Sequence, residues 1–218
     1  MFTHMATRTY QKKRRAEREA ETRLRIVEAI VALHREVGPA RTTVSAIAER
    51  AGVERLTVYR HFADETAMFQ ACSSHFATEV PGPDPAAWEE VAEPAERLRR
   101  ALLAFYDYYR RAEEMLVQVH RDLPRLPALA AVLSPWDEFV GGVRQDLLER
   151  WETSGEPRAR VSAAIAHALR FETWRSLAQM EGLRDEEAAD LMVTLVRAAA
   201  GARVCGEQIV STTDSGNS

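Results

Sequence analysis

The sequence predicts an all-helical fold of about nine helices, and three observations favour it. Apolar residues recur at helical spacing along most of the 218 residues. No stretch alternates apolar and polar side chains between turn residues, as a half-buried strand does. Glycine and proline fall mainly between the periodic segments, where helices end. We therefore expect a core made by packing helix on helix.

Four helices are expected in the N-terminal part of the chain. The first ends at Gly38-Pro39, because proline cannot continue a helix and glycine suits its end. The second has Thr43 as its N-cap and Gly52 just after its last residue. The apolar face of the first helix is formed by Ile26, Ile30, Leu33 and Val37, and the other three helices span about 44–51, 55–61 and 64–76.

A proline-rich run from Pro81 to Pro85 is the strongest break in the chain. It predicts two domains, residues 1–78 and residues 86–210. Pro135 is expected in the first turn of a helix of the second domain. The helices of that domain are expected over about 95–111, 113–121, 135–151, 157–181 and 185–204.

Charge is divided unevenly between the two parts of the chain. Residues 1–78 contain 13 basic and 9 acidic residues, a net charge of +4, whereas the remainder carries −8. A basic front on an acidic body suits contact between the N-terminal domain and a polyanion such as nucleic acid, and a basic tail that only keeps the protein in solution is the alternative.

The sequence lacks the common signs of a membrane protein, a disulfide scaffold or an enzyme. No apolar run reaches the ~18–20 residues that span a bilayer. The two cysteines, Cys72 and Cys205, are far apart, which fits a reducing cytoplasm. Histidines are scattered without metal-binding spacing, and no nucleophile motif or phosphate-binding glycine loop is present. We expect a cytoplasmic, non-enzymatic protein with no catalytic residue, metal ion, cofactor or membrane partner.

Residues 44–62 have the spacing of a helix-turn-helix. Two short helices that cross steeply need a small residue at the crossing, a turn residue that tolerates positive φ, and apolar residues that hold the second helix down. Ala48 supplies the small residue and Gly52 the turn, while Val53 and Val58 face inward. The segment therefore predicts a three-helix DNA-binding domain.

The second helix of this motif presents polar residues outward once Val58 is buried. Arg55 suits a bidentate contact to guanine, and Thr57 suits a thymine methyl or a phosphate. A basic flexible arm before the first helix adds attraction to phosphates. The remaining expected DNA contacts are Tyr59, Arg60, His61, Thr43, Lys13 and Arg14. A solvated helix face with no role in DNA binding is the alternative for each residue of the helix.

The stretch TVSAIAERAGVERLTVYRHFADETAMF resembles the signature of the tetracycline-repressor (TetR) family of transcriptional regulators. The motif match covers residues 26–69, and the rest agrees in size and helical pattern. The resemblance implies a homodimer that binds a palindromic double-stranded DNA operator and pairs through its last two helices. It also implies a larger C-terminal domain for a small-molecule effector, which we expect to release a repressor from the operator.

Two positions depart from the pattern of the family. Asp64-Glu65 stands where members commonly carry a lysine or similar donor, so a phosphate contact from the fourth helix is not expected. Arg55-Leu56 stands in the place often held by Lys-Gly, and the bulk of Leu56 limits the approach of the helix to DNA. These departures leave a second interpretation open, a helical ligand-binding or interaction protein that has lost operator binding.

Aromatic side chains fall on apolar faces of several helices in the second domain. They either fill a core or line a ligand cavity, and the sequence leaves both open. The resemblance implies that some bind an effector, with His120 as a polar anchor: Phe105, Tyr109, His120, Trp136, Phe139, Phe171 and Trp174. The small and apolar residues of the last two helices also have two interpretations, a buried core within one chain or an isologous dimer interface. These residues are Ala164, Ala168, Leu169, Ala188, Leu191, Leu195, Ala198, Ala199 and Ala202.

Overall fold

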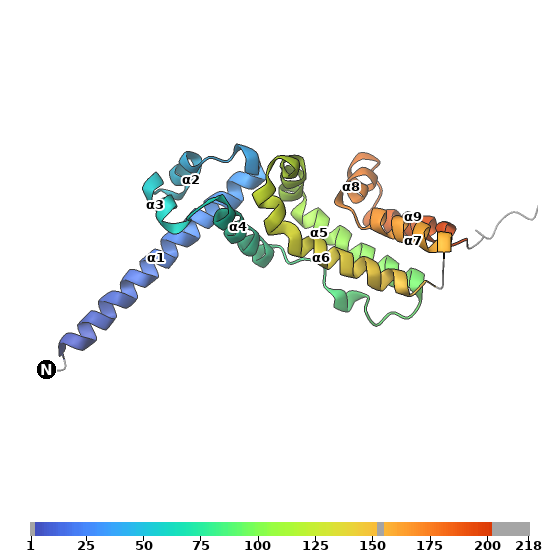
Figure 1. The fold of residues 1–218 in the computed structure, drawn as a ribbon, viewed down its shortest axis with the longest axis horizontal. Coiled ribbons are helices and arrows are strands. Elements are labelled where there is room, and N and C mark those ends of the chain that lie inside the picture. The colour runs from blue at the N-terminus through green and yellow to red at the C-terminus, as the bar shows by residue number, and fades with distance from the viewer. Residues whose placement is uncertain (1–2, 152–154, 202–218) are drawn as a thin grey trace, which may run out of the picture.

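Helices form every regular element in residues 3–151 and 155–201, the part of the chain that the structure describes. The structure is a computed structural model. The chain forms a smaller N-terminal lobe and a larger C-terminal lobe, and the start of the first helix projects away from both (Figure 1). The all-helical prediction is confirmed within these ranges. None of the described helices is long and apolar enough to cross a membrane.

The N-terminal lobe is held together by α1, which packs against both α2 and α4. Its elements are α1 Thr3–Glu36, the short turn η1 Pro39–Arg41, α2 Val44–Ala51, α3 Arg55–His61 and α4 Glu65–Glu79. The centre of the lobe contains Ile26, Ile30, Val58 and Phe62, each at most 2% exposed. The predicted bounds of α2 and α3 are confirmed, because local capping signals set them.

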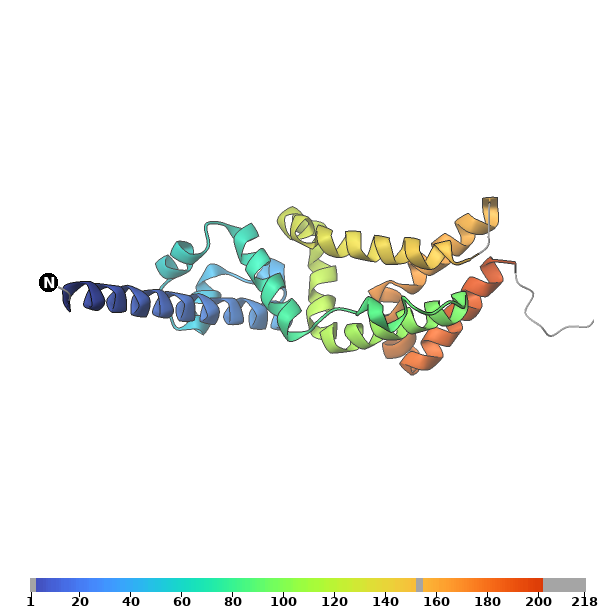
Figure 2. The same cartoon turned by 90° about the horizontal axis from the view of Figure 1, so that it is seen from below.

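The basic segment before Ile26 is helical, so the prediction of a flexible arm is wrong. Helix α1 runs without a break from Thr3 to Glu36, and its first part extends beyond the lobe (Figures 1 and 2). No glycine or proline interrupts it, and its lysine, arginine, glutamate and alanine residues favour helix. The basic side chains are therefore carried on a continuation of a core helix. We call residues 3–25 the helical arm.

The larger lobe is built around α5, which packs against α9. Its elements are η2 Pro85–Ala87, α5 Pro94–Asp122, η3 Leu123–Arg125, α6 Pro127–Glu149, α7 Gly155–Ala168, α8 Phe171–Trp174, the π-helix η4 Arg175–Met180 and α9 Asp185–Ala199. Leu98, Leu102, Phe105, Ile165 and Trp174 are fully buried in its core. Helix α4 packs on α6 and α1 on α5, so the two lobes share an interface.

Helices α5 and α6 are longer than the sequence predicts. Helix α5 is one helix, not two that meet at Ala112, because Ala112 is buried and no glycine or proline follows Pro94 before its end. Helix α6 begins at Pro127, and Pro135 lies inside it instead of in its first turn. An internal proline removes one helical hydrogen bond. Pro127 takes the N-terminal position that the sequence assigned to Pro135.

A single helix over residues 157–181 is also a wrong prediction. Helix α7 ends at Ala168, Arg170 is extended, and the chain continues as the short α8 and the π-helix η4. The break coincides with two hydrogen bonds from α5, in which Tyr106 and Tyr109 donate to the carbonyls of Ala168 and Leu169. Tertiary contacts therefore accompany the end of this helix, and the local sequence does not reveal them.

Candidate DNA-binding face and ligand cavity

The turn between α2 and α3 depends on Gly52. Its φ of 64° and ψ of 40° lie in the left-handed region, and its N–H donates to the carbonyls of Ala48 and Glu49. The N–H of Val53 also donates to Ala48 O, at 3.0 Å. Glycine adopts this conformation without the strain that a Cβ adds. The predicted turn at Gly52 is confirmed.

Helix α3 turns its apolar side inward and its polar side outward. Val58 is fully buried and Phe62, just after the helix, is 2% exposed. On the outer side Arg55, Tyr59 and Arg60 are exposed, while Thr57 and His61 are half-buried. An outward helix face of this kind has the dimensions to enter the major groove of DNA.

Leu56 adds apolar surface to this outer side, at 67% exposure. From the sequence we expect Leu56 only to limit how closely the helix approaches DNA. An exposed aliphatic side chain beside Arg55 also suits contact with a thymine methyl group. Arg60 Nη2 donates to Thr57 Oγ1 at 3.1 Å, which steadies the guanidinium on the same helix. The face therefore offers both hydrogen-bond donors and apolar contact.

Two polar residues near this face cap helices. Thr43 Oγ1 accepts from Ala46 N at 3.2 Å, so the predicted N-cap of α2 is confirmed. Asp64 Oδ1 accepts from Ala67 N at 2.8 Å at the start of α4. A carboxylate is stabilised by the unpaired N–H groups of a helix start. This cap explains why an acidic residue stands at Asp64, where a basic one would serve a phosphate contact.

The helical arm carries exposed cations. Lys13 Nζ lies 3.9 Å from Glu17 Oε1, and both side chains are more than half exposed. Such a surface pair contributes little free energy, so it does not hold Lys13 away from a phosphate. The Arg14 guanidinium lies 5.8 Å from the ring centroid of Tyr10. The predicted arm contacts are therefore exposed side chains of a helix.

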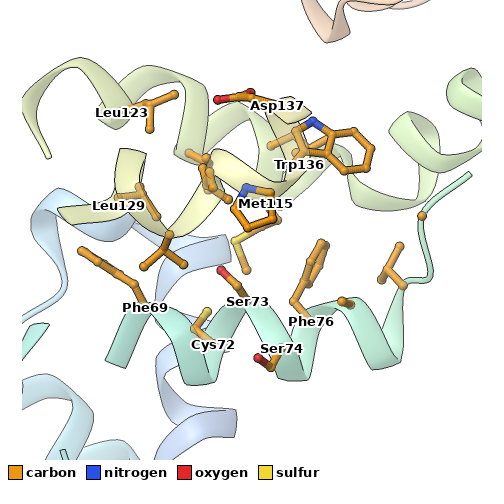
Figure 3. A pocket seen from close by; sticks show the side chains of 18 of the residues that line it. Phe69, Cys72, Ser73, Ser74, Phe76, Met115, Leu123, Leu129, Trp136 and Asp137 are labelled. Carbon is orange, nitrogen blue, oxygen red and sulfur yellow. The ribbon is translucent and has the colours of Figure 1, made fainter. Parts of the chain in front are cut away.

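A cavity of about 630 Å³ lies between the two lobes. Helix α4 runs along one side of it, and Phe69, Ser73 and Phe76 rise from α4 towards residues of α5 and α6 (Figure 3). The end of α1, η3 and the segment after α4 complete the wall. A volume of this size fits a small organic molecule.

Three of the seven residues predicted to bind a ligand line this cavity: His120, Trp136 and Phe139. The other four are at most 3% exposed and belong to the aromatic core of the larger lobe: Phe105, Tyr109, Phe171 and Trp174. Phe105 stacks on Phe139 with ring centroids 6.2 Å apart. These core rings therefore support the cavity wall from behind.

The wall formed by α1 and α4 is absent from the sequence-based set. Phe69, Cys72 and Phe76 recur at i, i+3 and i+7, which marks an apolar helix face. Because the sequence assigns α4 to the first domain, this face predicts only a local core. Tyr108, one residue before the predicted Tyr109, also lines the cavity.

His34 and Cys72 form a buried neutral pair in this wall. His34 Nδ1 lies 3.3 Å from Cys72 Sγ, and both residues are at most 5% exposed. Burial lowers the pKa of His34 to about 4 and raises the pKa of the Cys72 thiol to about 12. At neutral pH the thiol and the imidazole are therefore both uncharged. No three His, Cys, Asp or Glu side chains in the described residues are arranged to hold a metal ion.

His120 links the cavity to α8. Its Nδ1 lies 2.5 Å from Glu172 Oε1, and its ring packs against Phe171 with centroids 5.0 Å apart. With Nδ1 bonded to the carboxylate, Nε2 is the ring nitrogen left for a ligand.

The end of α5 holds the connection between α1 and α2. Asp122, only 3% exposed, accepts from Ala40 N at 3.0 Å, and Arg121 Nη2 donates to Val37 O at 3.0 Å. Between these bonds lies Gly38, with a φ of 91°. We call Arg121 and Asp122, with these hydrogen bonds, the α5 clamp. Two cavity-lining residues, His120 and Leu123, flank the clamp in the chain.

The residues predicted for a dimer face fall into two groups. Ala168, Leu169 and Ala188 are buried within the lobe, and Ala164 and Ala199 are half-buried. Leu191 and Leu195, one turn apart on α9, are 41% and 49% exposed. Ala198 is exposed on the same helix, and Ala202 lies outside the described residues. An outward apolar strip on α9 is therefore open to a partner.

Comparisons with known proteins agree with this architecture. Residues 26–72 match the family described as bacterial regulatory proteins, tetR family. A search of curated proteins gives no match. Among solved structures, a TetR-like transcriptional regulator from Rhodococcus sp. RHA1 is similar, with a TM-score of 0.61, 21% identity, and coverage of 83% of this chain and 96% of that one. A TetR-family regulator structure from Mesorhizobium loti MAFF303099 gives a TM-score of 0.57, 19% identity, and coverage of 84% and 97%.

At such identities the solved structures show the fold alone, and the evidence for the family comes from the sequence match. That match extends from the core of α1 through α2, Gly52 and α3 into α4. It therefore includes the whole helix-turn-helix and the first part of α4, the helix that forms one wall of the cavity. Residues 26–72, the N-terminal domain, are therefore a DNA-binding domain of the TetR family of transcriptional regulators.

Proposed function

We propose that the chain is a homodimeric repressor that leaves its palindromic operator when a small molecule occupies the cavity. In this proposal residues 1–78 are the DNA-binding domain and residues 86–210 are the ligand-binding and dimerisation domain. The observation that carries it is the position of α4. Helix α4 follows α3 after three residues, packs on α1, and forms one wall of the cavity.

On the operator, each α3 enters one major groove, and Arg55 reads a guanine through its exposed guanidinium. Leu56 and Thr57 meet neighbouring base edges, while Thr43, Tyr59, Arg60 and His61 contact sugar and phosphate groups. Lys13 and Arg14 extend the phosphate contacts along the helical arm. A dimer places its two recognition helices about one turn of DNA apart, roughly 34 Å, so operator binding is sensitive to their spacing.

A molecule in the cavity acts on that spacing in two ways. It contacts α4 directly, so it favours one separation of α4 from α6 over others. It also contacts His120 and Leu123, which adjoin the α5 clamp on the α1–α2 connection. A ligand whose preferred conformation differs from the operator-bound one weakens operator binding by its difference in affinity for the two.

Replacing Arg55 by alanine is expected to weaken specific operator binding by about 1–3 kcal/mol per half-site, because a bidentate base contact is lost. Non-specific binding should change far less, since phosphates dominate it. The measurement is fluorescence anisotropy with labelled DNA that flanks the coding region of this chain, titrated with protein at several salt concentrations. Arg150→Ala is the matched control, because Arg150 is exposed just after α6 in the other lobe.

For the unmodified protein, log K is expected to fall by roughly 0.9 per neutralised phosphate for each unit of log salt. If Arg55→Ala and Arg150→Ala reduce specific operator affinity equally, the outer face of α3 does not read the operator sequence. Sequence-blind, salt-insensitive binding by the unmodified chain would favour the alternative of a ligand-binding protein that no longer recognises an operator.

Replacing Leu195 by arginine is expected to convert the dimer to monomers, because the charge enters the apolar strip of α9 from both sides of a twofold interface. Operator binding should collapse with it, since the two half-sites no longer act together. Light scattering after size-exclusion chromatography measures the mass. Met180→Arg is the control, since Met180 is 76% exposed and lies in η4. A dimer that survives Leu195→Arg would exclude this strip as the interface.

A further inference from the structure

The lining of the cavity is rich in aromatic rings. Five rings come from three helices: Phe69 and Phe76 from α4, Tyr108 from α5, and Trp136 and Phe139 from α6. Trp136 packs against both Tyr108 and Phe139, with centroids 5.1 Å and 5.7 Å apart. Aliphatic and sulfur side chains, such as Met115 and Leu129 in Figure 3, fill much of the remaining wall. A flat, apolar molecule gains most from such a surface, because rings stack on it and water is released.

The charge of the lining selects against ions. Among the residues that line the described cavity there is no lysine or arginine, and the imidazole of His120 is already paired with Glu172, so an anion buried there would lose its hydration without a free counter-cation. Asp137 is the one acidic residue that lines the described cavity. Its side chain is exposed, so solvent screens its attraction for a cation. Deeper in the wall His34 is uncharged and bonded to Cys72. An uncharged molecule meets neither penalty.

One polar anchor stands out against this apolar wall. His120 lines the cavity, and Glu172 already holds its Nδ1, which fixes the orientation of the ring. Nε2 is therefore the ring nitrogen that remains available for a hydrogen bond to a ligand. Ser73, half-buried on the opposite helix α4, adds a hydroxyl that both donates and accepts.

We infer that the cavity binds an uncharged, ring-bearing apolar molecule with one hydrogen-bonding group, which is held at His120. The inference rests on the proposed function, in which this cavity is the effector site. It adds the chemical class of the ligand. It describes which molecules bind in the cavity, and the effect of that binding on operator affinity is a separate question.

Three dyes of one ring system test the class. N-phenylnaphthylamine is uncharged, anilinonaphthalene sulfonate carries an anion on the same rings, and a trimethylammonium derivative carries a cation. Fluorescence titration of the full chain is expected to show the uncharged dye binding at least about tenfold more tightly than either ion, because burying an unpaired charge is costly. Tighter or equal binding of the sulfonate or the ammonium dye would overturn the inference.

Two variants locate the binding and its selectivity. Trp136→Ala should weaken binding of the uncharged dye by at least about fivefold through lost ring contact, whereas Trp151→Ala, a tryptophan just after α6 that does not line the cavity, should leave it unchanged. Leu133→Lys introduces a cation into the wall and should shift the preference towards the sulfonate. Equal effects of the two tryptophan variants, or a folded Leu133→Lys protein with the original preference, would contradict the inference.

The same samples separate this inference from the proposed function. Operator binding is measured by anisotropy with and without saturating N-phenylnaphthylamine. If the uncharged dye binds in the cavity as expected but operator affinity stays constant, the effector role fails while the ligand class stands. If the sulfonate binds more tightly and releases the operator, the class fails while the effector role stands.

Discussion

Replacing Arg97 by methionine is expected to lower the free energy of unfolding by about 2–4 kcal/mol. Arg97 is 3% exposed and binds Asp146 of α6 through two nitrogens, with Nη2 2.7 Å from Oδ1 and Nε 3.1 Å from Oδ2. Its Nη1 also donates to Trp88 O at 2.9 Å and to the carbonyls of Glu89 and Val91. Methionine fills the space but leaves these acceptors without their donor.

We expect a smaller decrease in the free energy of unfolding than for a fully buried ion pair, because Asp146 is 40% exposed and water can reach it. Urea unfolding followed by circular dichroism measures the change. Arg99→Met is the matched control two residues away, since Arg99 pairs with Asp190 at the surface, with 32% and 59% exposure. That variant should change stability by less than about 1 kcal/mol. Similar midpoints for both variants would mean that the Arg97 network contributes little.

Replacing Gly38 by alanine is expected to destabilise the protein by about 3 kcal/mol and to weaken the coupling between cavity and operator. A Cβ at this position would lie 2.1 Å from Arg121 Nη2 and 2.5 Å from Asp122 Oδ2, so the α5 clamp must open. The φ of 91° adds backbone strain for any residue with a side chain. Both costs act where α5 meets the α1–α2 connection.

Gly182→Ala separates strain from clamp opening. Gly182 has a φ of 74°, but no atom lies within 4 Å of the position of its Cβ, so only the strain of about 1 kcal/mol is expected. Thermal unfolding measures stability, and anisotropy with and without N-phenylnaphthylamine measures the coupling. If dye still shifts operator affinity as strongly in Gly38→Ala as in the unmodified protein, the clamp is not part of the coupling.

The helix-turn-helix is the part of the fold that the sequence predicts best. The bounds of α2 and α3 follow from Thr43, Gly52 and the inward Val58, all of which act within a few residues of the elements that they define. The end of α7 is different, because the hydroxyls of Tyr106 and Tyr109 that bind there come from about 60 residues earlier in the chain. A tertiary hydrogen bond has no local signature.

The lining of the cavity was also only partly predictable from the sequence, because tertiary contacts form it. Trp136 and Phe139 were recognisable from the sequence as apolar aromatic residues of the second domain, but the opposite wall belongs to α4. Phe69 and Phe76 face the cavity because α4 packs on α6, and this contact joins two parts of the chain that the prolines after residue 80 predict to be separate domains. Periodicity identifies the apolar face of a helix, but it does not identify which helix will cover that face.

Helix α1 reaches from the exposed cations of the helical arm to His34 in the cavity wall, within one unbroken run of 34 residues. At 1.5 Å per residue such a helix is about 51 Å long. If it tilts as a straight lever about its cavity end, an angle of only ~5° displaces the opposite tip by roughly 4 Å, more than the length of a hydrogen bond. Lys13 and Arg14, about 30 Å from His34 along this helix, would move by roughly 3 Å, so a small change near His34 would alter their distance from the phosphates that we propose they contact.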